Sequence, residues 1–357
     1  MDIAQLLKQM VDAGASDLHL KVPNPPVLRI NGALVPQEKQ GPLSAAEIQA
    51  ILEQVTSPEQ RSVFDKEREL DFAYSIPGLA RFRVNVLQQR GTLSLAFRLL
   101  PFQIPSMEEL GLPDICKKLI MMPRGLILVT GPTGSGKSTT LAAMLSYLNE
   151  NTSRTVITIE DPIEFLYKDE RCFIAQRDLW DDTRSFSNAL KHALRHDPEV
   201  LVIGEMRDLD TISTAIMAAE TGHLVLGTLH TIDAAQTVDR IIDIFPHDQQ
   251  RQIRMQLSQV LEAVLSQVLL PRIGGGGRVA AFEVLIATSA MRKLIREEKI
   301  MEIGGNMELC GQEGMQTMDQ ALVKLVKNKL VTLENAQAKS SAHVRFNKFL
   351  QYSQEEE

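Results

Sequence analysis

The sequence predicts an α/β protein with two domains, a small mixed α/β domain and a larger one with a mostly parallel sheet. Its 357 residues, of which 44% are apolar and 23% charged, are enough for two full cores. From about Arg124 onward, strand-like and helix-like patterns alternate, which is typical of a parallel sheet covered by helices. The stretch "LPFQIPSMEEL" carries two prolines between periodic segments. We therefore expect an N-terminal domain at 1–100, a linker at 101–112 and a second domain at 113–357.

In the first domain, a helix start and a hairpin are the clearest signals. Ser44 is followed three residues later by Glu47, a capping box at the start of the amphipathic stretch "SAAEIQAILEQV". The runs "RFRVNVL" and "TLSLAFRLL" alternate apolar and polar residues on either side of "QQRG". This pattern puts Arg81, Arg83 and, once the hairpin pairs, Arg98 on one open face. That face is either a solvated sheet surface or a surface that meets an anion.

In the second domain, the strands are "GLILVTG", "TVITIEDP", "EVLVIGE" and "HLVLGTLHT". The helices between them include "STTLAAMLSYL", which repeats apolar residues at helical spacing, and "SFSNALKHALRHDP", which ends at Pro198. After Pro246 we expect mostly helix, apart from "GGGGRVAAFEVLIA", which combines a glycine turn with a strand.

Composition narrows the class of protein and its compartment. The net charge of −7 does not suggest general nucleic-acid binding, and no nucleic acid is expected as a partner. Three cysteines far apart in sequence indicate neither a disulfide framework nor a zinc site, which fits a reducing cytoplasm. The first twenty residues carry acids within their apolar pattern, unlike a signal peptide. Apolar runs are too short to span a bilayer, so any work at a membrane is done from one side.

The strongest motif is "GPTGSGKST", which lies between a predicted strand and a predicted helix. It matches G-x-x-x-x-G-K-[ST], in which glycines let successive backbone N–H groups face a phosphate. In that pattern Lys137 neutralises the β- and γ-phosphate oxygens and Ser138 holds Mg²⁺. The expected cofactors are therefore ATP and Mg²⁺. The expected nucleotide-binding residues are Gly131, Pro132, Thr133, Gly134, Ser135, Gly136, Lys137, Ser138 and Thr139.

Carboxylates follow two of the predicted strands. Glu160, Asp161 and Glu164 come at and after the end of "TIEDPIEF", and ligands collect beyond the carboxyl ends of strands in an open α/β sheet. Mg²⁺ and a water to be activated would offset their mutual repulsion; the alternative is an acidic surface turn. In "LVIGEMRD", Gly204 stands where an Asp is expected after the apolar run, and Glu205 follows it.

Two histidines flank the predicted strand "HLVLGTLHT", His223 at its start and His230 at its end. A histidine in a strand is usually structural, and neither spacing nor neighbours suggest a metal. A neutral histidine beside a nucleotide site can also sense the γ-phosphate.

Taken together, these motifs resemble the secretion-ATPase superfamily, and most closely the pilus-retraction ATPases of type IV pili. The resemblance covers nearly the whole chain. The stretches that carry it are "ASDLHL", "GPTGSGKSTT", "TIEDPIEF", "LVIGEMRD", "TGHLVLGTLHT", "DRIIDIFP" and "GMQTMDQAL". It implies a PAS-like N-terminal domain and a RecA-like P-loop ATPase domain with a helical C-terminal region. The family's second motif is normally Gly-Glu-Met-Arg-Asp, so the missing Asp is the family's own pattern.

The resemblance also implies roles for individual residues. Glu205 would orient Mg²⁺ through water, and Glu164 would be the general base for the attacking water. A base and a metal opposite a phosphoryl group are what in-line transfer requires. The predicted catalytic residues are Lys137, Glu164, Glu205, His223, His230, Arg81, Arg83 and Arg98, with the arginines as fingers in cis or in trans. The predicted Mg²⁺ ligands are Ser138 and Glu205, with Glu160 and Asp161 as further candidates.

At the level of assembly, the resemblance implies a homo-hexameric ring with ATP bound between the two domains. Hydrolysis would drive domain rotation and pilus retraction at the cytoplasmic face of the inner membrane. The implied partners are the inner-membrane pilus platform protein and other pilus ATPases. The alternatives are an accessory retraction ATPase, and an assembly or secretion ATPase, which usually has an extra domain and a four-cysteine zinc motif. From other classes, a DNA-translocating hexamer or a non-catalytic scaffold remain.

Two positions depart from the family's pattern. Glu298 replaces a glycine in "LIREEK", which concerns coupling in the C-terminal region and not hydrolysis. Ile232 stands where the family commonly has asparagine, next to the second histidine.

Overall fold

The computed structural model describes residues 2–352 except residues 31, 101–103, 180, 276 and 341–342. The chain divides into two compact units, one formed by residues 1–103 with 164–166 and the other by the remaining residues from 104 on. Residues 101–103 of the predicted linker lie outside the described part of the chain. In the rest of that linker, α4 (Met107–Leu110) begins with a capping box at Ser106 and packs with the second unit.

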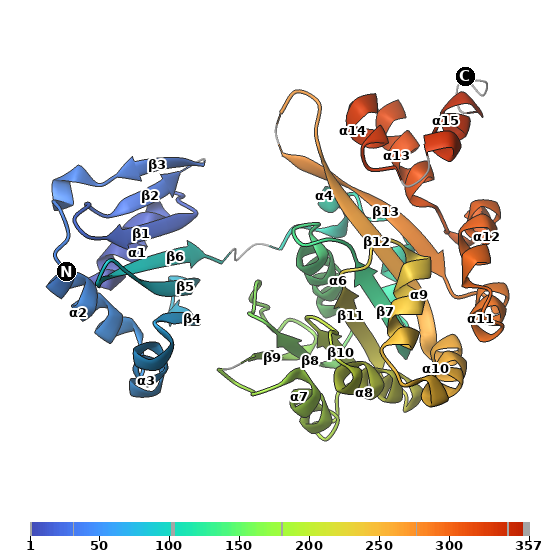
Figure 1. Ribbon diagram of the computed structural model, residues 1–357, viewed down its shortest axis with the longest axis horizontal. Coiled ribbons are helices and arrows are strands. Elements are labelled where there is room, and N and C mark those ends of the chain that lie inside the picture. Colours follow the sequence, from blue (N-terminus) through green and yellow to red (C-terminus); the bar gives the residue numbers. More distant parts are fainter. Residues whose placement is uncertain are drawn as a thin grey trace. The chain divides into compact units, whose positions relative to one another are not determined.

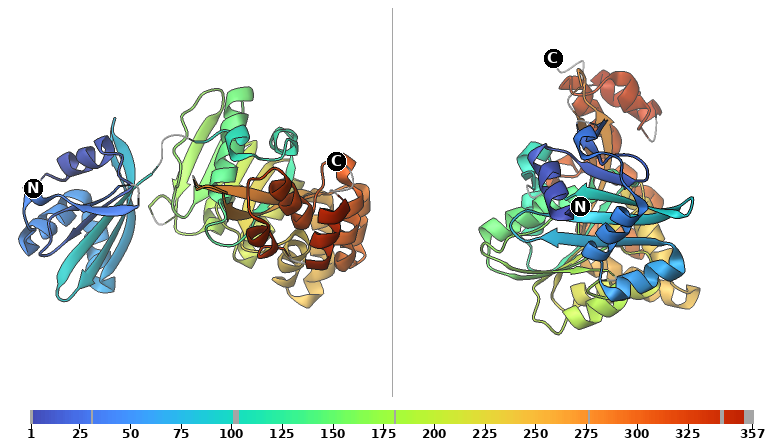
Figure 2. Two further views of the ribbon diagram at one scale, coloured as in Figure 1. Left: turned by 90° about the horizontal axis from the view of Figure 1, so that it is seen from above. Right: turned by 90° about the vertical axis from the view of Figure 1, so that its left-hand side faces the viewer.

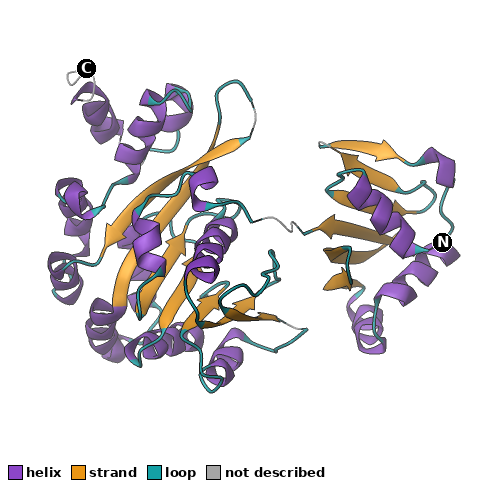
Figure 3. Ribbon diagram, turned by 180° about the vertical axis from the view of Figure 1, so that it is seen from behind, coloured by secondary structure: helices purple, strands orange, loops and turns teal. Residues whose placement is uncertain are grey.

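Among the described residues, the first unit is a six-stranded antiparallel sheet in the order β3-β2-β1-β6-β5-β4. Figures 1 and 3 show opposite sides of this sheet, with helices on one face. Alternate residues such as Phe82, Val84 and Phe97 are fully buried against those helices. The elements are α1 (Ile3–Asp12), β1 (Asp17–Lys21), β2 (Val27–Ile30), β3 (Ala33–Pro36), η1 (Glu38–Gln40), α2 (Ala45–Val55), α3 (Pro58–Glu67), β4 (Glu69–Ile76), β5 (Ala80–Gln89) and β6 (Thr92–Leu99).

Both local predictions for this unit are confirmed. Ser44 and Glu47 form the capping box at the start of α2. The hairpin pairs β5 with β6 so that Arg83 lies directly opposite Arg98. Its turn is tighter than predicted, because Arg90 and Gly91 alone connect the strands, with φ of 48° and 77°. Two positive φ values are typical of the tight turns that match strand twist.

In the described part of the second unit, seven strands form a sheet in the order β13-β12-β7-β11-β10-β8-β9. The pairings from β12 to β9 are parallel, and β13 runs antiparallel to β12. The strands are β7 (Gly125–Thr130), β8 (Thr155–Glu160), β9 (Phe173–Asp178), β10 (Val200–Ile203), β11 (Leu224–Leu229), β12 (Leu261–Pro271) and β13 (Arg278–Ile286). After β7, the chain forms β8 and the edge strand β9, and then β10 and β11, which fill the positions between β8 and β7. The next strand, β12, lies on the other side of β7. The carboxyl ends of these strands therefore meet at one edge, where ligands bind in such sheets.

Helices cover both faces of this sheet. Ile127 and Val129 of β7 face α4 to α6, whereas Leu126 and Leu128 face α7 to α12. The helices are α5 (Ile115–Ile120), α6 (Lys137–Asn151), α7 (Phe186–Ala193), α8 (Leu209–Glu220), α9 (Ala234–Asp243), α10 (His247–Val260), α11 (Ser289–Arg296), η2 (Ile300–Glu302), α12 (Ile303–Leu309), η3 (Gly311–Glu313), α13 (Met318–Lys327), α14 (Leu333–Gln337) and α15 (His343–Tyr352). No helix in the described ranges is long and apolar enough to cross a membrane.

One prediction for this unit is wrong: the region after Pro246 is less helical than expected. Residues 261–271, read as part of that helical region, form the strand β12 beside β7 in the middle of the sheet. The predicted strand after the glycines is β13. The helical C-terminal region itself is present, since α13, α14 and α15 share a core with the ends of β12 and β13. These helices gather together in Figures 1 and 2.

Candidate functional site

The predicted phosphate-binding loop joins the carboxyl end of β7 to α6, and its shape requires glycine. Gly131, Gly134 and Gly136 have φ of 142°, 77° and 92°, a region that side chains disfavour. A Cβ atom at Gly131 would lie only 2.4 Å from the carbonyl oxygen of Gln267. Gly136 is the N-cap residue of α6 and has no side chain that could cap the helix. Helix N-termini of this kind are suited to binding an anion through backbone N–H groups.

The side chains of the loop fit a phosphate ligand. The Lys137 ammonium donates to the carbonyl oxygens of Gly131 at 2.8 Å and Pro132 at 3.3 Å, which holds it across the loop. Ser138 and Thr139 are half-buried on the first turn of α6, and Thr133 is exposed.

Ser135 supplies independent evidence that the loop is shaped for a polar ligand. The residue is only 3% exposed, and its hydroxyl has no hydrogen-bond partner among the described residues. A buried hydroxyl without a partner is costly and is usually satisfied. A phosphate oxygen or an ordered water in the loop would satisfy it.

Glu205 links the second motif to this loop. It follows β10, and its Oε1 lies 2.9 Å from Nε2 of His230, just beyond the end of β11. Nδ1 of the same histidine is 3.4 Å from the Thr133 hydroxyl in the phosphate loop. Arg207 forms an ion pair with the same carboxylate. The carboxyl ends of β10, β11 and β7 thus place a carboxylate, an imidazole and the loop in one connected group.

The neighbours of Glu205 keep its carboxylate charged. Burial alone would raise its pKa. The hydrogen bond from Arg207 and the charges of His230 and Arg207 outweigh burial, so the pKa of Glu205 lies below its usual value. An ionised carboxylate of this kind is suited to holding a cation or an ordered water and is a weak proton acceptor.

The structure also explains why glycine precedes Glu205. A Cβ atom at Gly204 would lie 3.1 Å from the Cα atom of Glu160 and 3.1 Å from the carbonyl oxygen of Ile159. The end of β10 therefore packs directly on the backbone at the end of β8. An aspartate at this position would force the two strand ends apart, and the carboxylate is supplied one residue later.

The other predicted acids differ in their surroundings. Glu160 accepts hydrogen bonds from the Thr158 hydroxyl at 2.6 Å and from Gln176 at 3.1 Å, so it stabilises its own strand end. Asp161 and Glu164 are exposed in the segment after β8. The base role of Glu164 and the metal roles of Glu160 and Asp161 stay predictions. No group of three or more His, Cys, Asp or Glu in the described residues is arranged to hold a metal. Mg²⁺ in phosphate-transfer sites is typically held by one or two protein groups and the substrate phosphates, which Ser138 and Glu205 fit.

His223 does not lie with His230. It stands at the amino end of β11, where Nδ1 is 2.9 Å from the carbonyl oxygen of Ala218 at the end of α8. Its contacts are those of a residue that satisfies a helix terminus. Within one chain it is at the opposite edge of the sheet from the phosphate loop, and its predicted catalytic role stays a prediction.

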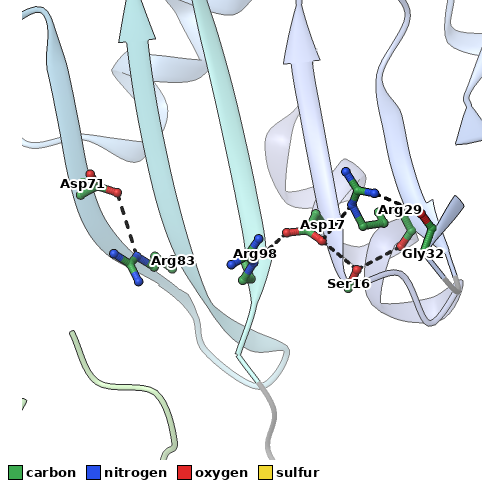
Figure 4. Close-up of polar contacts among 7 residues, drawn as sticks. All are labelled: Ser16, Asp17, Arg29, Gly32, Asp71, Arg83 and Arg98. Atoms are coloured by element: carbon green, nitrogen blue, oxygen red, sulfur yellow. Dashed lines mark hydrogen bonds and ion pairs between the residues drawn. The ribbon is translucent and has the colours of Figure 1, made fainter. Parts of the chain in front are cut away.

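On the open face of the first unit, carboxylates accompany the arginines (Figure 4). Arg29, Asp17, Arg98 and Arg83 lie in one cross-strand row. Asp17, which is 5% exposed, accepts from Arg98 Nε at 2.8 Å and lies 3.5 Å from Arg29 Nε. Nε of Arg83 lies 4.0 Å from Oδ1 of Asp71. The predicted face exists, but its charges are partly neutralised by the protein itself. An anion is therefore not needed to explain this arrangement, and the finger roles of Arg81, Arg83 and Arg98 stay predictions.

Comparison with known proteins places this site in a family. The family model described as "Type II/IV secretion system protein" matches residues 1–338. The chain belongs to this family. Within it, the chain is 47% identical to the "Type IV pilus retractation ATPase PilT" of Pseudomonas aeruginosa, over 97% of this chain and 100% of that protein. It is 42% identical to the "Type IV pilus ATPase PilU" of the same organism, over 95% of this chain and 88% of that protein.

A solved structure agrees with these sequence relatives. The crystal structure of the pilus retraction motor PilT with bound ADP matches with a TM-score of 0.91 and 46% identity, covering 98% of this chain and 99% of that one. The predicted fold class and the resemblance to retraction ATPases of the secretion family are therefore confirmed. These relatives identify the chain as an ATPase of the secretion family.

Sequence reasoning missed two residues of the site. Arg207 was visible in "GEMRD" but carried no assigned role, although it pairs with Glu205. Gln267 lies in β12, a segment predicted to be helical, and no local sequence motif indicates a role for it.

Proposed function

We propose that this protein is a hexameric, Mg²⁺-dependent ATPase motor that drives type IV pilus retraction. The observation that carries the proposal is the connected group of Lys137, Glu205 and His230 at the carboxyl edge of one sheet. It occurs in a chain that is similar over nearly its whole length to a pilus-retraction ATPase.

The residues divide the work as follows. The amides of the loop and the Lys137 ammonium bind the phosphates. Ser138 and Glu205 would hold Mg²⁺, Glu205 through water, and the ion would neutralise charge that develops on the phosphates. His230 orients Glu205 and touches the loop, and it is placed to sense whether a γ-phosphate is present. Glu164 accepts the proton of the attacking water, and an arginine of the first unit stabilises the transferred phosphoryl group.

Retraction also implies a place and partners. The ring works at the cytoplasmic face of the inner membrane, against the pilus platform protein and together with other pilus ATPases. Similarity to PilU over 95% of the chain favours an accessory retraction ATPase as the second candidate. Both candidates hydrolyse ATP at the same residues.

Deletion of the gene, followed by imaging of surface pili, tests the proposal. Excess pili that do not retract are the expected result, and bald cells would instead indicate an assembly ATPase. Complementation with the wild-type gene should restore retraction, whereas Lys137→Ala should not, because that residue alone supplies the loop's charge to the phosphates. An accessory ATPase would leave retraction partly intact, with a loss of force only.

A further inference from the structure

The strand β12 brings a buried glutamine to the phosphate loop. β12 pairs with β7 in parallel register, and Ser266 lies opposite Thr130, the last residue of β7. Gln267 is the next residue, so it stands beside Gly131, where the loop begins. Its side chain is almost fully buried, with 1% exposure.

Both the nitrogen and the oxygen of the Gln267 carboxamide form hydrogen bonds. Nε2 donates to the carbonyl oxygen of Ser135 at 2.6 Å, and Oε1 accepts from the Thr140 hydroxyl at 2.8 Å. Ser135 belongs to the loop, and Thr140 lies in the first turn of α6. A backbone carbonyl oxygen can only accept, so the N–H₂ end of the carboxamide must face Ser135. Its oxygen then faces the Thr140 hydroxyl, which can donate.

Glycines surround Gln267 on the loop side. Its own carbonyl oxygen lies 2.4 Å from where a Cβ atom of Gly131 would be, and its Nε2 lies 3.1 Å from the corresponding position at Gly136. The loop therefore closes around this one residue. Any side chain at either glycine would displace the loop from it.

The bond to Ser135 has a consequence for phosphate binding. In a trans peptide, the carbonyl of one residue and the N–H of the next point in opposite directions within one plane. Holding the Ser135 carbonyl toward Gln267 therefore turns the N–H of Gly136 away from β12. N–H groups of this loop and of the helix start are the groups that bind phosphate.

We propose that Gln267 is a positioning residue for nucleotide binding: its carboxamide fixes the Ser135–Gly136 peptide so that the Gly136 N–H faces the phosphate. The inference rests on the proposed function of the loop and adds a residue that is 132 positions away in the sequence. It touches no substrate atom and acts through the loop backbone.

The test compares two variants in β12. One removes buried hydrogen bonds that hold the loop, and the other removes a buried hydrogen bond that does not involve the loop. Gln267→Met keeps the size of the side chain and loses both bonds. Ser266→Ala is the matched control. Ser266 precedes Gln267 in β12, and its hydroxyl accepts from the Thr130 hydroxyl of β7 at 2.8 Å, a bond that does not involve the loop backbone. Both variants should lower the melting temperature. Only Gln267→Met should weaken ADP binding, by about tenfold in Kd, with KM for ATP raised more than kcat is lowered.

A second pair of variants separates positioning from packing. Thr140→Val removes only the second hydrogen bond of the carboxamide, the one that holds its oxygen, and should raise the Kd for ADP about threefold, whereas Thr140→Ser should restore it. If Gln267→Met lowers stability but leaves Kd within twofold of wild type, the residue is structural and the proposal is overturned. If that variant does not fold, an unchanged Kd in Thr140→Val overturns it equally. Failure of the wild-type protein to bind ADP would refute the proposed function of the loop instead.

Discussion

At the scale of single residues, the two candidate catalytic acids differ in their surroundings. Glu205 is ionised and paired with Arg207 and His230, and its pKa lies below its usual value. Glu164 is exposed and follows the end of β8 by four residues. A charged, oriented carboxylate suits a cation or an ordered water. We therefore expect Glu205 to hold the cation, and the general-base role of Glu164 stays a prediction.

Replacement of Glu205 by glutamine should abolish turnover without abolishing nucleotide binding. The change keeps the shape of the side chain but removes the charge that holds Mg²⁺ and weakens its bonds to Arg207 and His230. We expect kcat to fall at least about 10²-fold, with the Kd for ADP within a few-fold of wild type. Glu220→Gln, at the end of α8, is the control. Loss of ADP binding in Glu205→Gln would show that the carboxylate has a structural role.

The arginines can be ranked by a similar comparison. An arginine finger contributes about 10³–10⁵ in rate, whereas a solvated arginine contributes almost nothing. We expect at least one of Arg81→Ala, Arg83→Ala and Arg98→Ala to lose activity in that range. Arg29→Ala is the matched control, because Arg29 shares Asp17 with Arg98 in the same row. Wild-type turnover in all three variants would leave the face as an ordinary sheet surface.

At the scale of elements, the parts of the structure that depend on a few consecutive residues could be predicted, and those that depend on contacts between distant residues could not. The phosphate loop, the capping box of α2 and the β5–β6 hairpin could each be read from a few consecutive residues. β12 could not, because a strand buried on both faces lacks the alternation of polar and apolar residues. Leu261, Val264, Leu265, Val268 and Leu269 repeat at helical spacing within it. Gln267 reaches a loop 132 residues away, and no periodicity reveals such a contact.

The end of α11 shows how this chain replaces a family glycine. Glu298 has a left-handed φ of 61°, where glycine is favoured. Its Oε1 lies 2.5 Å from Nη1 of Arg254, whose side chain is 13% exposed.

Glu298→Ala should be less stable than Glu298→Gly by about 1 kcal/mol, because both variants lose the ion pair but only alanine keeps the backbone strain. Urea unfolding of both variants measures the difference. Since alanine normally stabilises helices relative to glycine, the order of the two variants decides the point. Equal or reversed stability would mean that the left-handed conformation carries no strain.

Glu283 connects two helices through their N-termini. Its Oε1 accepts from the backbone N–H of Ala234 in α9 at 2.8 Å, and its Oε2 accepts from Met318 in α13 at 3.3 Å. Burial, together with the nearby carboxylates of Asp233 and Asp319, raises the pKa of Glu283 to about 7, although its two backbone hydrogen bonds act in the other direction. α9 begins four residues after His230, so Glu283 joins the segment that follows His230 to the C-terminal helix α13.

This raised pKa predicts a pH dependence of stability. The folded chain keeps a proton on Glu283 that the unfolded chain, with a pKa near 4.5, releases. The stabilisation is complete below pH about 4.5 and is lost as pH rises through about 7, by up to about 3 kcal/mol. The unfolding free energy of Glu283→Gln should lack this decrease, while exposed Glu302→Gln should retain it. Parallel pH profiles for Glu283→Gln and wild type would contradict the assignment.

At the scale of the whole molecule, the proposed motor divides its functional groups between two units. The loop, Glu205 and His230 belong to the second unit, and the arginine row belongs to the first. A ring of identical subunits joined head to tail repeats one interface around its axis. Such an interface would let the arginine of one protomer serve the loop of its neighbour.

Mixing two inactive variants tests whether this happens. Lys137→Ala protomers have intact arginines and an inactive phosphate loop. Arg98→Ala protomers have an intact phosphate loop and lack the Arg98 side chain. Light scattering with Mg²⁺ and nucleotide should first show assemblies of about six protomers for each variant. If Arg98 acts in trans, a random equal mixture forms about a quarter of its sites with both groups intact, and activity partly returns. Arg98→Ala mixed with the double variant Lys137→Ala/Arg98→Ala is the control, since no site in that ring is complete. No return of activity in the first mixture would mean that Arg98 acts in cis, and a monomer with full turnover would contradict the ring itself.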